Sequence, residues 1–178
     1  SLTLVAGTNT ALATISNVNG GTDDVAADNT SQLIINPVVP ALGKMVVGEE
    51  GTGTWCQWCP RGAVFMDQYE NNFSDFWAGV AVHNGDPMVV TLYDQGMNFS
   101  GYPSAKVDRV GAGIDPSAMQ GSFFNRLQTP PTAFVEVGAT YDTATRVLYV
   151  SGKFDFQAAA NSGYKAAFVL TEDGVTGG

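Results

Sequence analysis

The two cysteines of the chain, Cys56 and Cys59, stand two residues apart between an apolar run and an amphipathic pattern. The run, residues 44–48, is short and continuous, which is typical of a strand buried on both faces. After the cysteines, apolar residues recur at helical spacing while polar residues fill the opposite face. The apolar positions are Gly62, Phe65, Met66, Tyr69 and Phe73. One strand therefore leads into one helix through a turn that carries both cysteines.

The same order of strand and helix continues further along the chain, which predicts an α/β (α+β) domain. The later elements are a strand at 76–82, a helix after Asp86 and Pro87, a strand at 104–110, and a helix after Asp115 and Pro116 with Met119, Phe123 and Leu127 on one face.

Both flanking regions carry β patterns. Short strand candidates occur within residues 1–36, separated by a turn-rich stretch at 17–21. Beyond residue 131 apolar and polar residues alternate in two runs joined by residues 142–145, which predicts a hairpin. With residues 165–170 as a further strand, we expect part of a β-sandwich, and the chain to be a fragment of a longer polypeptide.

Charge and hydropathy exclude several classes of protein. The formal net charge is -9, with 8 Lys and Arg against 17 Asp and Glu, and no basic cluster could neutralise a row of phosphates, so nucleic acid is not an expected partner. No apolar run approaches the roughly 20 residues that a membrane span requires. The 21 glycines and the many Asn, Thr and Ser give a low-charge surface that is more typical of exported proteins.

A Cys-x-x-Cys pair has three interpretations: a dithiol redox centre, half of a zinc site, or a structural staple. A zinc site needs four ligands, and besides the cysteines the chain has a single histidine, His83, so we predict no metal. A staple across two residues closes so short a loop that it removes little entropy from the unfolded chain. Haem or copper handling would need Met or His clusters that the sequence does not show. The strand-to-helix setting favours redox exchange without a dissociable cofactor.

The position of the cysteines predicts their separate roles. If Cys56 lies at the helix start, unpaired backbone N–H groups and the helix dipole stabilise its thiolate, and its pKa falls below the free value of about 8.5. Cys59, one turn on and more buried, would then attack the mixed disulfide formed at Cys56. Pro60 is tolerable because it falls in or near the first turn.

The order strand, Trp-Cys-x-x-Cys, helix, strand, and then a proline before an antiparallel strand resembles the thioredoxin family over residues 44–128. The resemblance implies a central mixed sheet, a buried proton-relaying carboxylate at Glu50, and a cis-proline at Pro103 facing the cysteines. Glu50 has an alternative interpretation as a solvated charge at a strand end beside Glu49, and Pro103 as an ordinary trans turn proline. There is room for only one strand between residues 104 and 115, so the second strand of the usual terminal hairpin is absent, displaced or supplied by the later β region.

Four segments together are similar to the twenty-eight-kilodalton outer membrane protein-related family of bacterial envelope proteins. They are residues 53–62, 81–88, 101–104 with Asp108 and Arg109, and 170–175. This resemblance implies export to the envelope, in the periplasm or at the outer membrane surface, with a lipid anchor outside this chain. It defines no biochemical activity. We expect a β-rich segment at 1–36, a thioredoxin-like domain at 44–131 and an incomplete hairpin or sandwich segment at 132–178.

Other candidate residues surround the cysteines. The predicted topology brings His83 and Pro103 towards Cys56, so His83 could tune the thiolate. The alternative, which we favour, is that His83, Asn84 and Asp86 form a hydrogen-bonded loop and helix cap. Trp55, Trp58 and Tyr102 could form an exposed apolar rim for partner chains or could serve local packing.

The leading hypothesis is a thiol-disulfide oxidoreductase domain that exchanges disulfides with protein substrates through Cys56 and Cys59. The competing hypothesis is a cell-surface or adhesion module in which the two cysteines form a permanent disulfide. The partners in the first case are protein thiols and disulfides.

Overall fold

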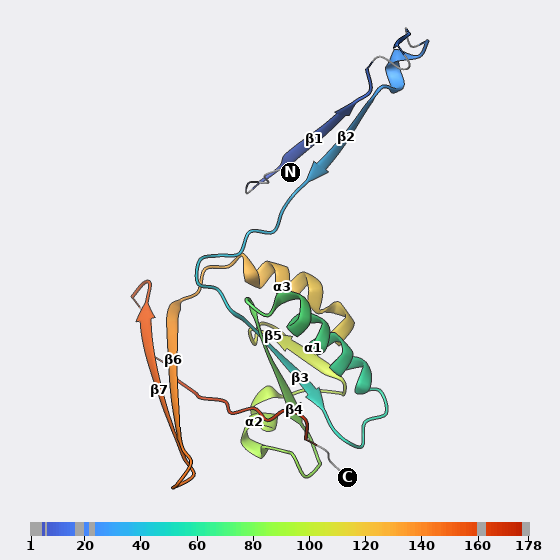
Figure 1. Ribbon diagram of the computed structural model, residues 1–178. Coiled ribbons are helices and arrows are strands. Elements are labelled where there is room, and N and C mark those ends of the chain that lie inside the picture. Colours follow the sequence, from blue (N-terminus) through green and yellow to red (C-terminus); the bar gives the residue numbers. More distant parts are fainter. Residues whose placement is uncertain (1–4, 6, 17–19, 22–23, 160–162, 176–178) are drawn as a thin grey trace. The chain divides into compact units, whose positions relative to one another are not determined.

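The computed structural model describes residue 5 and residues 7–16, 20–21, 24–159 and 163–175 (Figure 1). The chain divides into two compact units, one ending at Val39 and the other beginning at Pro40.

The first unit contains an antiparallel hairpin. Its strands are β1, Asn9–Thr14, and β2, Thr30–Ile35, preceded by the short 3-10 helix η2, Ala26–Asp28. Both strands were predicted. The central part of the predicted turn, residues 17–19, lies outside the described residues. Leu12, Leu33 and Ile34 stay more than half exposed, so the hairpin has no buried face of its own.

The second unit contains a three-stranded mixed sheet in the order β4-β3-β5. The central strand β3, Val46–Thr52, pairs in parallel with β4, Trp77–His83, and antiparallel with β5, Ser104–Val107. The predicted third strand ends early because Asp108 and Arg109 adopt left-handed backbone conformations, with φ of 49° and 54°. Beyond them only a single bridge, between Ala105 and Ile114, extends the pairing at this edge.

Two helices bury the hydrophobic core against one face of this sheet. They are α1, Pro60–Phe73, and α3, Met119–Leu127, which follows the 3-10 turn η3, Pro116–Ala118. The core residues are Val46, Tyr69, Trp77, Ala105, Val107, Met119, Phe123 and Leu127. The prediction that one face of α3 carries the apolar residues is confirmed. The helix predicted to open at Asp115 and Pro116 begins there as η3, whose N-cap Asp115 accepts a hydrogen bond from the Ser117 N–H, and α3 itself starts later, at Met119.

The helix α2, Thr91–Met97, begins later than predicted. Asp86 and Pro87 were expected at its start, but Val90 is its N-cap residue. The Asp86 carboxylate accepts the Met88 N–H as a cap would, but the residues that follow form only a turn, in which the Val89 N–H donates to the Asp86 carbonyl. The prediction of a helix cap at Asp86 is therefore wrong.

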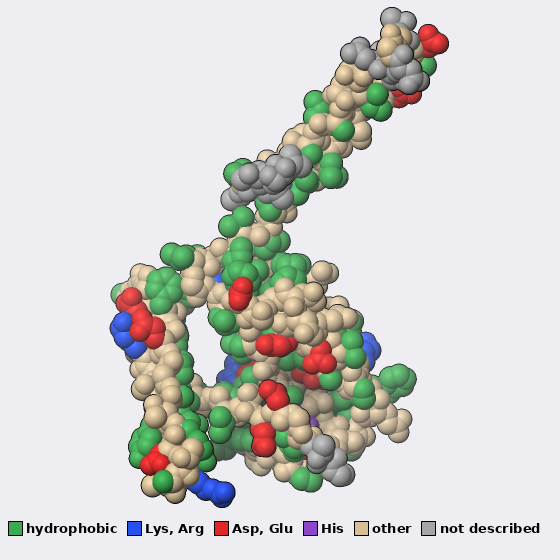
Figure 2. Space-filling view, in the orientation of Figure 1, with side chains coloured by type: hydrophobic (Ala, Val, Ile, Leu, Met, Phe, Trp, Pro, Cys, Tyr) green, Lys and Arg blue, Asp and Glu red, His purple; other side chains and the backbone are tan. Residues whose placement is uncertain are grey.

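The predicted C-terminal hairpin is confirmed. It consists of β6, Ala133–Asp142, and β7, Val147–Phe156, joined by a turn in which the Asp142 carboxylate accepts hydrogen bonds from the backbone N–H groups of Ala144 and Thr145. The register places Ala133, Val135, Val137, Ala139 and Tyr141 on one face with Phe156, Phe154, Val150 and Leu148. Figure 2 shows hydrophobic side chains along the hairpin, and all of the large ones on this face are at least 39% exposed.

The predicted strand at 165–170 is wrong. The described residues 163–175 contain no strand, and the segment approaches β7 through the ring of Phe168, which lies close to Gly152. Within the second unit, the β6–β7 hairpin and the mixed sheet share no strand pairing among the described residues, and the expected sandwich stays a prediction. The described part of this segment forms no backbone ladder with β7, which explains why its strand-like composition does not produce a strand.

Candidate functional site

Cys56 and Cys59 form a disulfide at the start of α1, with their Cα atoms 5.4 Å apart. A tight turn brings them together, in which the Cys56 N–H donates to the Gly53 carbonyl and the Cys59 N–H to the Cys56 carbonyl. Cys59 is the N-cap residue of α1 and Pro60 its first residue, as expected for a proline that lacks an N–H. Cys56, which was considered at the helix start, therefore lies in the turn before α1, and Cys59 lies at its N-cap.

The two cysteines differ little in exposure, because 8% of Cys56 and 3% of Cys59 are accessible. The order is the predicted one, with Cys59 the more buried. Trp58, which lies between them in sequence, is 73% exposed and adds an apolar surface beside the disulfide. A group that approaches from solvent can reach the Cys56 side of the bond more easily.

Glu50 lies beneath the first turn of α1 and is 2% exposed. Its Oε1 comes so close to Gly62 that a Cβ atom placed there would be 1.9 Å away. No described residue gives this oxygen a hydrogen bond, and burial raises the pKa of Glu50 from 4.5 to about 7. The interpretation of Glu50 as a solvated charge is therefore wrong.

Glu49 is a second buried carboxylate, which no pattern in the sequence singled out. It is 1% exposed and faces the other side of β3, because neighbouring strand residues point to opposite faces. Its oxygens accept hydrogen bonds from the Arg109 guanidinium and the Tyr93 hydroxyl. The ion pair raises the pKa of Arg109, and burial together with Glu49 raises that of Tyr93. A motif containing Arg109 was noted in the sequence, but no sequence signal paired it with Glu49.

The peptide bond between Tyr102 and Pro103 is cis, as predicted, directly before β5. Antiparallel pairing puts Ser104 opposite Gly51, near the end of β3 that leads to the cysteine turn. The rings of Tyr102 and Trp55 meet edge to face with centroids 5.5 Å apart. The structure thus brings together two of the three predicted rim aromatics.

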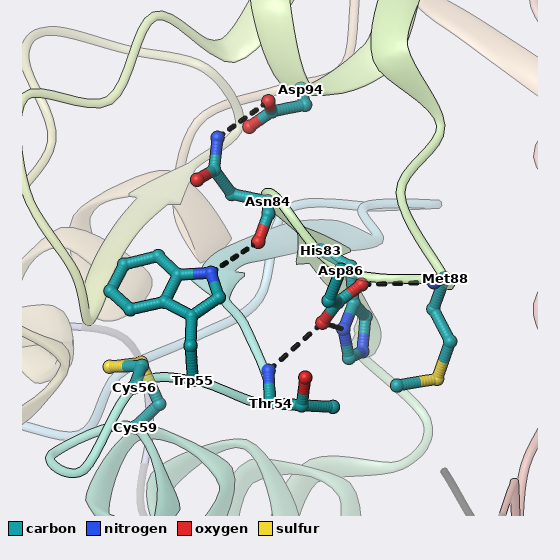
Figure 3. Close-up of polar contacts among 9 residues, drawn as sticks. All are labelled: Thr54, Trp55, Cys56, Cys59, His83, Asn84, Asp86, Met88 and Asp94. Atoms are coloured by element: carbon teal, nitrogen blue, oxygen red, sulfur yellow. Dashed lines mark hydrogen bonds and ion pairs between the residues drawn. A yellow bond between two sulfur atoms is a disulfide. The ribbon is translucent and has the colours of Figure 1, made fainter. Parts of the chain in front are cut away.

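A loop after β4 holds the segment that precedes the cysteines (Figure 3). His83 Nδ1 lies 2.6 Å from Asp86 Oδ2, and the same oxygen accepts a hydrogen bond from the Thr54 N–H. The Asn84 carbonyl accepts a hydrogen bond from the indole N–H of Trp55. The favoured interpretation of His83 as a loop residue is confirmed in its hydrogen bonds, and tuning of Cys56 by His83 stays a prediction.

The same loop sets the protonation of Asp86. Burial alone would raise the pKa of Asp86, but hydrogen bonds from His83 and from the backbone of Thr54 and Met88 lower it. Asp86 is therefore an anion at neutral pH, and its charge anchors the turn that leads into the cysteines.

The fold and site define a mixed α+β protein with an oxidised Cys-x-x-Cys pair at a helix start. No protein-family model matches the chain, and no curated protein matches it. Among solved structures it is similar to HBP35 of Porphyromonas gingivalis, with 24% sequence identity and a TM-score of 0.48. The match covers 66% of this chain and 45% of that chain, so this chain spans less than half of HBP35.

Among the described residues, no helix has the length and apolar character needed to cross a membrane. No group of three or more His, Cys, Asp or Glu side chains among them gathers in a metal-binding arrangement.

Proposed function

We propose that the chain is a thioredoxin-like thiol-disulfide oxidoreductase domain that exchanges disulfides with protein substrates. The observation that carries the proposal is the disulfide at the start of α1 above a buried carboxyl group, Glu50, whose pKa of about 7 suits proton transfer at neutral pH. Supporting features are the order of strands and helices in the second unit and the cis bond before Pro103.

In the reduced protein the Cys56 thiolate attacks one sulfur of a substrate disulfide and displaces the other as a thiolate. Cys56 is then joined to the substrate through a mixed disulfide. The Cys59 thiol gives up its proton, attacks the Cys56 sulfur, and releases the second substrate sulfur as a thiolate, so the substrate is reduced and the Cys56 pair is oxidised. The same steps in reverse oxidise a substrate dithiol.

Two parts of the chain support this chemistry. The cysteines lie at the N-terminal end of α1, where the positive end of the helix dipole favours a thiolate in the reduced pair. Glu50 serves as the base that takes the Cys59 proton and later returns a proton to a leaving thiolate. No described hydrogen bond fixes the protonation of Glu50 Oε1. The pKa of Glu50 can therefore respond to whether Cys56 and Cys59 are reduced or oxidised.

We also propose that the domain acts in the bacterial envelope. The sequence resemblance to envelope proteins supports this location, and so does a net charge of -9 with few charged residues in all. The substrates would be cysteine pairs of exported proteins.

The test is the reduction potential of the Cys56 pair together with exchange against a folded protein disulfide. We expect a potential between about -270 and -120 mV, the range of exchange catalysts. Cys56→Ser should abolish exchange, whereas Cys59→Ser should accumulate a mixed disulfide with substrate. Asp67→Ala, on the exposed side of α1, serves as a control that leaves both unchanged. A potential well below about -300 mV with no thiol reactivity would refute catalysis.

The second candidate is an adhesion module with a structural disulfide. The open apolar face of the β6–β7 hairpin favours it, because such a face is typical of protein contact sites. Loss of folding on reduction of the disulfide, without exchange activity, would support this candidate over the first.

A further inference from the structure

Trp55 and Tyr102 are joined through the carboxylate of Asp94. The Tyr102 hydroxyl donates to Asp94 Oδ1 at 3.1 Å, and the Asn84 side-chain amide donates to Asp94 Oδ2 at 2.8 Å. Asn84 in turn accepts the indole N–H of Trp55 at its backbone carbonyl, at 2.6 Å. The rings of Trp55 and Tyr102 also contact each other directly, so the four residues form a closed set of contacts. Figure 3 draws the part that runs from Trp55 through Asn84 to Asp94.

The two aromatic residues occupy the positions next to the proposed chemistry. Trp55 directly precedes Cys56, and Tyr102 directly precedes the cis-bonded Pro103. Trp55 is 53% exposed, so packing alone does not hold its ring. Both rings are held at their polar ends, and the Tyr102 ring is half-buried because it also meets the ring of Phe99.

A surface that is already ordered loses less conformational entropy when a partner binds. Both oxygens of Asp94 are used, one by the Asn84 side chain and the other by the Tyr102 hydroxyl. Asp94 is only partly exposed, and it is the acidic residue in the first turn of α2. A helix-stabilising role alone would not require hydrogen bonds to two other segments.

We propose that Asp94 is a positioning residue that holds Trp55 and Tyr102 as a preformed contact surface for protein substrates. Asp94 does not touch the reacting sulfurs; it acts through Asn84 and the Tyr102 hydroxyl. The inference rests on the proposed function for the identity of the bound chain. It identifies the residue that determines preference for protein disulfides over small ones.

The first experiment compares substrates. Asp94→Ala should raise KM for a folded protein disulfide by about tenfold, since two hydrogen bonds are lost. Its rate with a small symmetrical disulfide should stay within about twofold of wild type, because that substrate needs no extended surface. Asp94→Asn, which can keep one acceptor and offer one donor, should recover most of the loss. The control Asp67→Ala should change neither value. Equal losses with both substrates, or no loss with either, would overturn the proposal.

The second experiment needs no exchange reaction. The indole N–H signal of Trp55, assigned with Trp55→Phe, should shift and exchange with solvent several-fold faster in Asp94→Ala and in Tyr102→Phe. The indole signal of Trp77, which is buried in the core, should stay unchanged. An unchanged Trp55 signal would overturn the positioning role even if catalysis is found. A wild-type protein that exchanges no disulfide would instead refute the proposed function, while this measurement still reports on Asp94.

Discussion

The mixed sheet and the β6–β7 hairpin both carry apolar side chains on their strands, but only the sheet is covered. Phe123 of α3 is fully buried over the sheet, whereas Phe154 of β7 is 39% exposed. The difference is that helices follow the sheet strands along the chain and fold back on them, while the hairpin is followed by a segment without regular structure. An apolar pattern in a strand shows that one face is hydrophobic. Whether that face is buried depends on another element of the chain packing against it.

The largest expected effect separates these two phenylalanines. Phe123 contacts the rings of Tyr69, Phe73, Trp77 and Phe124, so Phe123→Ala should lower the free energy of unfolding by about 3–5 kcal/mol. Phe154→Ala should cost about 1 kcal/mol or less, because much of the ring is exposed already. Urea unfolding followed by the signal of buried Trp77 measures both. A similar loss in the two variants would mean that the hairpin packs as tightly as the sheet.

The second effect concerns the buried carboxyl group of the sheet. The folded state favours protonated Glu50, with a pKa of about 7 against an ordinary 4.5. The folded protein therefore binds more protons than the unfolded chain between these values, so stability is full below pH 4.5 and falls as the pH rises towards 7. We expect a loss of about 2–3 kcal/mol between pH 5 and pH 8 that Glu50→Gln removes. Urea unfolding at both values measures it, and identical pH profiles for the two proteins would contradict it.

The third effect tests the close approach of α1 to the sheet. Gly62→Ala places a Cβ atom against Glu50 and should destabilise the fold by about 1–3 kcal/mol. Gly121→Ala is the matched control, because a Cβ atom at that helical position meets nothing within 4 Å, and it should stabilise by about 0.5–1 kcal/mol. Thermal unfolding measures both. Combining Gly62→Ala with Glu50→Ala should relieve most of the loss, and simple additivity would count against the contact.

The smallest effect lies in the hairpin. Lys153 and Glu136 pair across the strands with side chains 71% and 75% exposed, so Lys153→Met should change the free energy of unfolding by less than about 1 kcal/mol. In the sheet region, Lys44 pairs with Asp108 and both side chains are nearly buried. Lys44→Met should cost more, and the two losses should keep this order at high salt. A larger loss for Lys153→Met than for Lys44→Met would contradict the view that burial makes the ion pair of the sheet region the stronger one.

The sequence predicted the elements around the cysteines well because their signals are local. The apolar periodicity of α1, the Asp115 cap and the proline after Cys59 are each determined by neighbours within a few residues. The burial of Glu50 and the cis bond at Pro103 were implied by the thioredoxin resemblance rather than by local pattern. Both are found in the structure.

Long-range pairings could not be predicted in the same way. Glu49 finds its counter-ion 60 residues away in Arg109, and no periodicity encodes such a contact. Asp86 has the pattern of a helix cap, yet only a turn follows it, and one of its carboxylate oxygens accepts the N–H of Thr54, 32 residues earlier. The residues 165–170 have strand composition but no partner strand in the described chain.

Glu49 and Glu50 are consecutive in sequence but belong to separate environments, because β3 acts as a partition between them. One carboxylate is neutralised by Arg109 on its own face of the sheet, while the raised pKa of the other arises from burial alone. Substitutions on the α2 side can therefore retune the ion pair without disturbing the proton affinity beneath the cysteines. The protonation of Glu50 and the ion pair of Glu49 can therefore change independently of each other.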